Sequence, residues 1–223
     1  MNDTYKTVLF DLDGTLLDTT PLIMASFRHT LDRHCPGQYG DKEILACLGE
    51  PLLEQMKKLG GEEEAEAMVK TYREHNIAHH DDYVEAFPGV AETLDRMYQA
   101  GICMGVVSNK QRRTVEMGLA LCDLEKYMSV VVCNGDTPRP KPDPSPIRKA
   151  VEGIGANPSS TLMVGDTRYD LQAAKRAGVA AAGVAWSHGG AEALKAYQPD
   201  VLLERMTDLL PIVGIEPDKG ARE

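Results

Sequence analysis

Two carboxylates separated by one residue follow an apolar segment near the start of the chain. The segment Thr7–Phe10 predicts a buried strand, and Asp11-Leu12-Asp13-Gly14-Thr15 follows it directly. Like charges held close together in a poorly solvated site resist joint ionisation, whereas a divalent cation bound by oxygen ligands, typically Mg²⁺, relieves that cost. One carboxylate could then attack phosphorus while the other handles the leaving-group proton. The alternative is a surface turn after a strand, but such turns seldom combine two acids and a Thr.

Polar side chains also follow a second predicted strand, Ile102–Val107, where Ser108 and Asn109 precede a predicted helix. Ligands of open parallel sheets bind beyond the carboxyl ends of the strands, and a helix N-terminus offers N–H groups to a phosphate. These two residues are therefore candidates for phosphate binding. Taken alone, Ser108 is better explained as the N-cap of the following helix.

Lys141 lies in a segment that has proline at every second position from Pro138 to Pro146. Asp143 followed by Pro144 predicts an N-cap and a first helical turn, which places Lys141 in a rigid loop just before a helix. A lysine there can bind a phosphoryl oxygen and reduce the repulsion between a carboxylate nucleophile and an anion. A stiff polyproline spacer is the alternative.

The fourth predicted strand, Thr161–Val164, is followed by Gly165-Asp166-Thr167-Arg168-Tyr169-Asp170. Asp166 closes the strand and Asp170 falls in the first turn of the next helix, so both could face one point and complete an oxygen cage for a metal. The simpler account, an N-cap and an acid at a helix N-terminus worth about 1 kcal/mol or less each, explains Asp170 better than Asp166.

Short apolar strands alternate with amphipathic helices through most of the chain, which predicts right-handed crossovers and a parallel sheet. The predicted strands are Thr7–Phe10, Ile102–Val107, Ser129–Cys133, Thr161–Val164, Ala180–Ala185 and Asp200–Leu203, and the helices between them are Val90–Ala100, Arg112–Leu121, Pro144–Ile154, Tyr169–Ala177 and Ala191–Tyr197. Residues 19–82 contain only helical stretches. We therefore expect an α/β fold with a Rossmann-like parallel sheet core, residues 1–18 and 83–223, and an all-α insert after the first strand, residues 19–82.

Composition limits the classes of partner. The chain has 223 residues, 43% of them hydrophobic, and a net charge of −10, which argues against nucleic acids and anionic membranes as partners. No apolar run approaches the roughly 18 residues of a membrane span. The five cysteines form no CxxC pair and are expected to be reduced packing residues of a cytoplasmic protein. His75, His79 and His80 could bind zinc, but solvated helix histidines are the expectation.

The four strand-end signals, in the order DxDGT, SN, KPDP and GDTRYD, resemble the haloacid dehalogenase superfamily of phosphohydrolases over nearly the whole chain. The resemblance implies that Asp11 is a nucleophile forming an aspartyl-phosphate and that Asp13 is the general acid and base. It implies that Ser108 and Lys141 hold the phosphoryl group, with Thr15 and Asn109 also assigned to substrate binding. It further implies that Asp11, Asp166 and the main-chain carbonyl of Asp13 bind Mg²⁺ with Asp170 nearby, and that residues 19–82 form a helical cap.

Three further segments, residues 34–39, 72–81 and 183–187 with Gly190, resemble the pyrophosphatases of Gram-positive bacteria that are linked to serine-phosphorylated HPr. The expected reaction is hydrolysis of inorganic pyrophosphate to phosphate. A phosphoglycolate phosphatase, another small-molecule phosphatase or mutase, and a catalytically silent binding protein are the alternatives. The second phosphoryl group of pyrophosphate would need a local cationic site on this acidic chain, for which Arg28 and Lys110 are candidates.

Overall fold

A computed structural model describes residues 5–186 and 188–216. Ser187, the last residue of the segment 183–187 that resembles the pyrophosphatases, lies outside the described residues. The chain divides into two compact units. One contains the residues up to 17 and from 86 onward, and the other contains residues 18–85. The division predicted from the sequence was at residues 19 and 82. Two short strands, β2 (Leu17–Asp18) and β3 (Glu85–Ala86), form a two-stranded sheet where the chain passes between the units.

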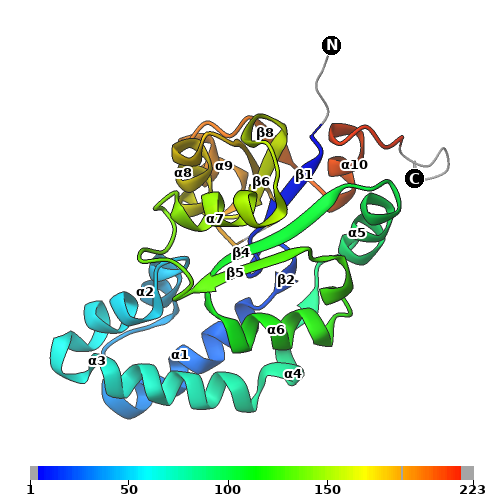
Figure 1. Cartoon of the computed structure of the whole chain (residues 1–223). Helices are drawn as coiled ribbons and strands as arrows, with labels where there is room; N and C mark the ends of the chain where they lie inside the picture. The colour runs from blue at the N-terminus through cyan, green and yellow to red at the C-terminus, as the bar shows by residue number, and fades with distance from the viewer. Residues whose placement is uncertain (1–4, 187, 217–223) are drawn as a thin grey trace. The chain divides into compact units, whose positions relative to one another are not determined.

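The first unit contains a six-stranded parallel sheet in the order β5-β4-β1-β6-β7-β8 (Figure 1). Its strands are β1 (Thr7–Phe10), β4 (Cys103–Gln111), β5 (Val130–Asn134), β6 (Thr161–Gly165), β7 (Ala180–Val184) and β8 (Val201–Leu203). Leu9 of β1 is opposite Gly105 of β4 on one side and Met163 of β6 on the other. Every residue of β1 and β6 is buried, as expected of central parallel strands covered on both faces. The predicted α/β fold with a Rossmann-like parallel sheet is confirmed.

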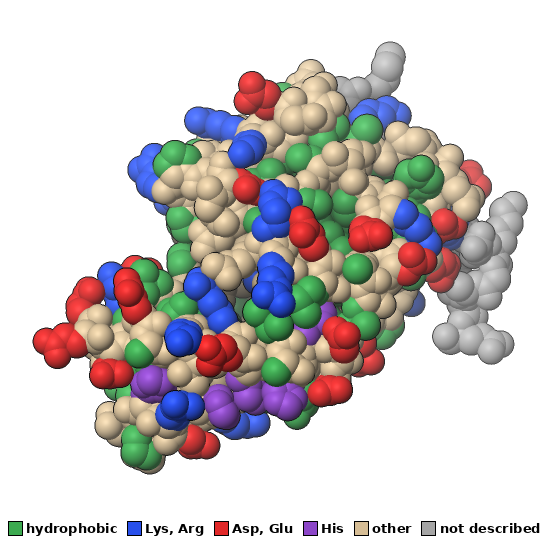
Figure 2. Space-filling model, turned by 60° about the horizontal axis from the view of Figure 1, so that its bottom comes forward, with side chains coloured by type: hydrophobic (Ala, Val, Ile, Leu, Met, Phe, Trp, Pro, Cys, Tyr) green, Lys and Arg blue, Asp and Glu red, His purple; other side chains and the backbone are tan. Residues whose placement is uncertain are grey.

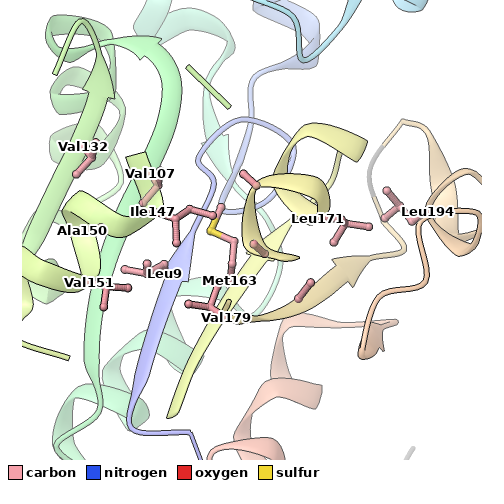
Figure 3. Packing of buried hydrophobic residues seen from close by; sticks show 13 residues of the cluster. Leu9, Val107, Val132, Ile147, Ala150, Val151, Met163, Leu171, Val179 and Leu194 are labelled. Atoms are coloured by element: carbon pink, nitrogen blue, oxygen red, sulfur yellow. The ribbon is translucent and has the colours of Figure 1, made fainter. Parts of the chain in front are cut away.

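Helices cover both faces of this sheet. The crossovers through α5 (Val90–Gln99) and α6 (Arg112–Leu121) run along the sheet in one direction, and those through α7 (Ser145–Ile154) and α8 (Arg168–Ala177) run in the other. Because crossovers are right-handed, the two pairs lie on opposite faces. Leu9, Val107 and Met163 pack against Ile147 of α7 and Leu171 of α8 in one buried cluster (Figure 3).

The remaining elements of this unit are short. They are α9 (Gly190–Lys195), α10 (Leu209–Ile212) and three 3₁₀ turns, Glu125–Tyr127, Pro158–Ser160 and Met206–Asp208. α9 packs against β7, and α10 packs against α5. Among the described residues, no helix combines the length and the apolar character that crossing a membrane requires.

The second unit is helical, with α1 (Thr20–His34), α2 (Asp41–Cys47), α3 (Leu52–Ala78) and α4 (His80–Tyr83). Asp18 accepts a hydrogen bond from the Thr20 N–H at 3.1 Å, and Pro21 follows in the first turn of α1. The core of the unit is a separate apolar cluster in which the rings of Phe27 and Tyr72 meet edge to face at 5.1 Å. Gly61, with a φ of 82°, interrupts α3 with a kink.

Histidine side chains gather on one face of the helical unit (Figure 2). The ring of His75 stacks on that of His29, with centroids 4.6 Å apart, and is tilted against that of His79, with centroids 4.5 Å apart. His80 differs from the expectation of a solvated side chain, because it is 1% exposed at the start of α4 and its Nδ1 lies 2.7 Å from Asp81 Oδ1. The prediction of solvated helix histidines is therefore wrong for His80.

Two other sequence predictions need correction. β4 continues past Val107 to Gln111, because a bulge allows the polar residues after Val107 to stay in the strand. All five cysteines are free thiols, but Cys103 is exposed rather than packed, since it is the first residue of β4.

Candidate active site

Asp11 and Asp166 follow neighbouring strands at the carboxyl edge of the sheet. Phe10 of β1 is opposite Val164 of β6, and the Asp11 N–H donates to the Val164 carbonyl at 2.9 Å. After β1 the chain continues to β4 on one side of this pair of strands, and after β6 it continues to β7 on the other side. The two aspartates therefore mark a topological switch point, which is where open α/β sheets bind ligands.

The loop after Asp11 is shaped by a close approach to Asp166. Gly14 has a φ of 76°, and a Cβ atom added to it would lie 2.3 Å from Asp166 Oδ2, so both its conformation and its surroundings require glycine. Thr15, expected to bind substrate, is fully buried in this loop, and its hydroxyl has no hydrogen-bond partner among the described residues. The Thr15 carbonyl accepts a hydrogen bond from the Trp186 indole at 3.3 Å.

Lys141 joins three parts of the site, the end of β1, the first turn of α8 and the backbone of β4. Its Nζ donates to Asp11 Oδ1 at 2.7 Å, to Asp170 Oδ1 at 2.6 Å and to the Val107 carbonyl at 2.5 Å. These three contacts match the three donors of an ammonium group, and the side chain is only 2% exposed. Lys141 is thus fixed beside the carboxylate of Asp11.

Asn109 holds the backbone of Lys141. Its Oδ1 accepts from the Lys141 N–H at 2.9 Å, and its Nδ2 donates to the Lys141 carbonyl at 3.0 Å. Asn109 was expected to bind substrate, and both polar groups of its side chain are engaged in this pair. Ser108, which is 5% exposed, accepts a hydrogen bond from the Lys110 N–H at 3.1 Å. Both residues lie between Val107 and Gln111, where the pairing of β4 with β5 shifts its register.

Asp170 is oriented by Thr167, a residue that the sequence reasoning did not single out. Asp170 Oδ2 accepts from the Thr167 N–H at 3.0 Å and from its hydroxyl at 2.6 Å, in a capping box at the start of α8. The pattern Thr167-x-x-Asp170 is a recognised sequence signal for this motif and could have revealed it. The helix after Lys141 was predicted to begin at Pro144, whereas α7 begins at Ser145. Asp143 Oδ1 accepts a hydrogen bond from the Ser145 N–H at 2.9 Å.

Two carboxyl groups of the site, those of Asp11 and Asp166, are more difficult to ionise than in water. Burial raises the pKa of Asp11 to about 7, because the charge of Lys141 offsets only part of the desolvation and Asp170 adds to it. Burial, with the charges of Asp170 and Asp11, also raises the pKa of Asp166 well above its ordinary value. Burial alone would lower the pKa of Lys141, but the carboxylates of Asp11 and Asp170 outweigh that effect and raise it. Additional positive charge in the site would therefore stabilise the ionised carboxylates of Asp11 and Asp166.

The donor set suits a hard divalent cation. Asp11, Asp166 and Asp170 each offer a carboxylate oxygen, and the three oxygens lie within 4.8 Å of one another. Asp166 Oδ1 is buried and has no hydrogen-bond partner among the described residues, which is costly unless another ligand, such as a cation, satisfies it. Oxygen-only donors are those that Mg²⁺, Ca²⁺ and Mn²⁺ prefer.

Asp13 lies in an ion pair with Lys110. The Lys110 Nζ donates to Asp13 Oδ1 at 2.8 Å, and the two side chains are 15% and 23% exposed. Arg28, the other cation suggested for a second phosphoryl group, makes a two-point contact with Asp41 in the helical unit, at 2.8 Å and 2.5 Å. The Arg28 guanidinium thus already has a partner carboxylate.

Comparison with known sequences identifies the family. A family model described as haloacid dehalogenase-like hydrolase matches residues 8–184. A protein named pyrophosphatase PpaX from Bacillus velezensis is 46% identical over 209 residues, covering 94% of this chain and 96% of the relative. A pyrophosphatase PpaX from Halalkalibacterium halodurans is 43% identical over 211 residues, covering 95% and 98% of the two chains.

Solved structures share the fold. A putative haloacid dehalogenase-like hydrolase from Bacteroides fragilis has a TM-score of 0.86 at 27% identity, covering 92% of this chain and 99% of the other. A putative phosphoglycolate phosphatase from Lactobacillus plantarum has a TM-score of 0.83 at 24% identity, covering 94% and 99%. With its acidic cluster, its buried lysine and this extent of similarity, the chain belongs to the haloacid dehalogenase-like hydrolase family.

Proposed function

We propose that the protein is a Mg²⁺-dependent phosphohydrolase that converts inorganic pyrophosphate to phosphate through an aspartyl-phosphate on Asp11. The observation that carries the chemistry is the contact of a buried lysine with Asp11 beside an acidic cluster that suits a cation. The choice of pyrophosphate is supported by relatives that are named pyrophosphatases and are 43% to 46% identical over nearly the whole chain.

Asp11 is the proposed nucleophile. A carboxylate oxygen of Asp11 attacks one phosphorus atom, the bond from that phosphorus to the bridging oxygen breaks, and inorganic phosphate leaves with the electron pair. Lys141, fixed at 2.7 Å from Asp11 Oδ1, reduces the repulsion between the carboxylate and the anionic phosphoryl group. Water then hydrolyses the aspartyl-phosphate, which releases the second phosphate and restores Asp11.

Asp13 is the proposed general acid and base. It donates a proton to the bridging oxygen as the first phosphate leaves, and it accepts a proton from the attacking water in the second step. Its side chain is more exposed than that of Asp11, at 23% against 12%, so it is accessible to a leaving group. The two aspartates thus divide attack and proton transfer between them.

Mg²⁺ is the proposed cofactor. Asp11, Asp166 and the main-chain carbonyl of Asp13 would hold it, with Asp170 nearby as a further acidic group. Bound there, the ion supplies positive charge that stabilises the negative charge developing in phosphoryl transfer. Asp170 has both oxygens engaged by Lys141 and Thr167, so its main contribution is to position these groups.

The transferred phosphoryl group is proposed to contact Ser108 and Thr15, with the positive charge of Lys141 beside it. The buried, unpartnered hydroxyl of Thr15 supports a role for it as a donor. Asn109 supports the substrate site through the Lys141 backbone, to which both of its polar groups are bonded. We propose that the reaction takes place in the cytoplasm, because five free thiols are typical of a reducing compartment.

Phosphate release from pyrophosphate, with and without Mg²⁺, tests this function. The wild-type protein should release phosphate only when Mg²⁺ is present, and Asp11→Asn should reduce the rate by several orders of magnitude because it removes the attacking charge. The variant's circular dichroism spectrum should match that of the wild type. Near-normal turnover by Asp11→Asn, with contaminating enzyme excluded, would contradict the covalent mechanism.

A further inference from the structure

Lys110 reaches the active site because β4 departs from its regular register. The pairing of β4 with β5 shifts between Val107 and Gln111, and Lys110 lies in that interval. A bulge at the end of a strand redirects side chains, and here the Lys110 Nζ contacts Asp13 Oδ1 at 2.8 Å, although the residues are 97 positions apart. The backbone of the bulge is further held by the Lys110 N–H, which donates to Ser108 Oγ.

The two lysines of the site differ in how fully their charges are engaged. The ammonium of Lys141 has three partners and is 2% exposed, so all of its donors are already in use. Within the described part of the chain, the ammonium of Lys110 bonds only to Asp13, and its side chain is 15% exposed. An ammonium has three donors, so Lys110 has donors left for a ligand.

The place of Lys110 relative to the proposed chemistry follows from its partner. Lys141 contacts the nucleophile Asp11, on the side of the phosphoryl group that is transferred. Lys110 instead contacts Asp13, which must lie beside the bridging oxygen if it is to protonate the leaving group. Lys110 is therefore on the leaving-group side of the site.

We propose that Lys110 binds the leaving phosphate of pyrophosphate and so selects a substrate with a second phosphoryl group. This inference rests on the proposed hydrolysis of pyrophosphate. When the bond to the bridging oxygen breaks, the departing phosphate keeps the electron pair and takes one proton from Asp13, and the Lys110 ammonium offsets its remaining charge. The chain has a net charge of −10, so the positive charge that binds an anionic phosphate has to come from individual side chains near it. The flexible stem of a lysine can turn from Asp13 to the phosphate.

Substrate selectivity of Lys110 variants tests this proposal. Lys110→Gln removes the charge but keeps a donor for Asp13, and Lys110→Arg keeps the charge. The probes are pyrophosphate and p-nitrophenyl phosphate, whose leaving group has no second phosphoryl group. Lys110→Gln should lower kcat/KM for pyrophosphate at least tenfold more than for p-nitrophenyl phosphate, mainly through a higher KM, and Lys110→Arg should restore most of the difference.

Lys126→Gln is the matched control, because Lys126 pairs with Asp123 just before β5 at the amino edge of the sheet and should leave both activities unchanged. Circular dichroism and thermal melting show that each variant is folded. If the wild type prefers pyrophosphate but Lys110→Gln loses both activities equally, Lys110 only positions Asp13 and the proposal is overturned. If Lys110→Gln loses neither activity, Lys110 contributes to neither reaction and the proposal is overturned as well. If the wild type has no preference for pyrophosphate, the proposed function fails, and the role of Lys110 fails with it.

Discussion

Replacing the proposed nucleophile should make the metal-free protein more stable while abolishing its activity. In the absence of a cation, burial and neighbouring carboxylates raise the pKa of Asp11 from its ordinary 3.8 to about 7. Between these two values the folded protein keeps a proton on Asp11 that the unfolded chain releases. Because the folded state binds more protons there, the free energy of unfolding falls as the pH rises. Asn at this position has a similar shape and avoids that loss.

The size of the effect follows from the shift of about three pKa units. One unit corresponds to about 1.4 kcal/mol, so Asp11→Asn can gain up to about 4 kcal/mol at pH 8, the gain shrinking toward zero near pH 4. Urea unfolding in the presence of EDTA at several pH values measures it. Adding Mg²⁺ should then stabilise the wild type more than the variant, because the ion binds the folded site that contains Asp11.

A second aspartate provides a matched control with the opposite sign. Hydrogen bonds from Ser145 lower the pKa of Asp143, so its charged form is favoured in the folded protein and Asp143→Asn should be neutral or destabilising at pH 8. The reasoning is refuted if Asp11→Asn is less stable than the wild type at pH 8 in EDTA. That result would mean that the ion pair with Lys141 outweighs the cost of burying the Asp11 carboxylate.

Other substitutions test single parts of the site. Asp13→Asn should lose turnover but keep its Mg²⁺ affinity, because the metal ligand proposed at this position is the main-chain carbonyl. Asp166→Asn should lose Mg²⁺ binding, as measured by calorimetry. Equal losses of Mg²⁺ affinity in the two variants would contradict this division of roles. Asn109→Ala should lower kcat for pyrophosphate by about tenfold or more. Asn109→Asp should have an intermediate kcat, because it keeps the oxygen that accepts from the Lys141 N–H. Unchanged kinetics in both variants would exclude a positioning role for Asn109. Gly14→Ala should displace Asp166 and abolish Mg²⁺-dependent turnover. Gly101 has the same φ of 76° but open space around it, so Gly101→Ala is the control and should lower only the stability of the protein. Equal activity of the two variants would contradict the close approach of Gly14 to Asp166.

The carboxyl-edge residues could be predicted because parallel strands end at one edge of a sheet. Once Thr7–Phe10 and Thr161–Val164 are recognised as parallel strands, Asp11 and Asp166 fall at the same edge of the sheet, and the family resemblance assigns both to one metal site. The capping box of Thr167 and Asp170 was equally visible as a local pattern.

The contacts of the two lysines could not be predicted in this way. The bulge that places Lys110 beside Asp13 arises in polar residues that carry no strand pattern, and the pair spans 97 positions. Lys141 bonds to the Val107 carbonyl, which has no signature in a side-chain pattern. The burial of His80 likewise depends on how α4 packs against α1, not on its own sequence neighbours.

The measurement that tests the proposed function most directly is a comparison of kcat/KM for pyrophosphate and for phosphoglycolate at the same Mg²⁺ concentration. Phosphoglycolate offers a carboxylate where pyrophosphate offers a second phosphoryl group, so the two substrates share the chemistry at Asp11 and differ at the leaving group. If pyrophosphate is the substrate, its kcat/KM should exceed that for phosphoglycolate by tenfold or more, which corresponds to about 1.4 kcal/mol in transition-state binding. A protein that hydrolyses phosphoglycolate with the higher kcat/KM would contradict the proposed function.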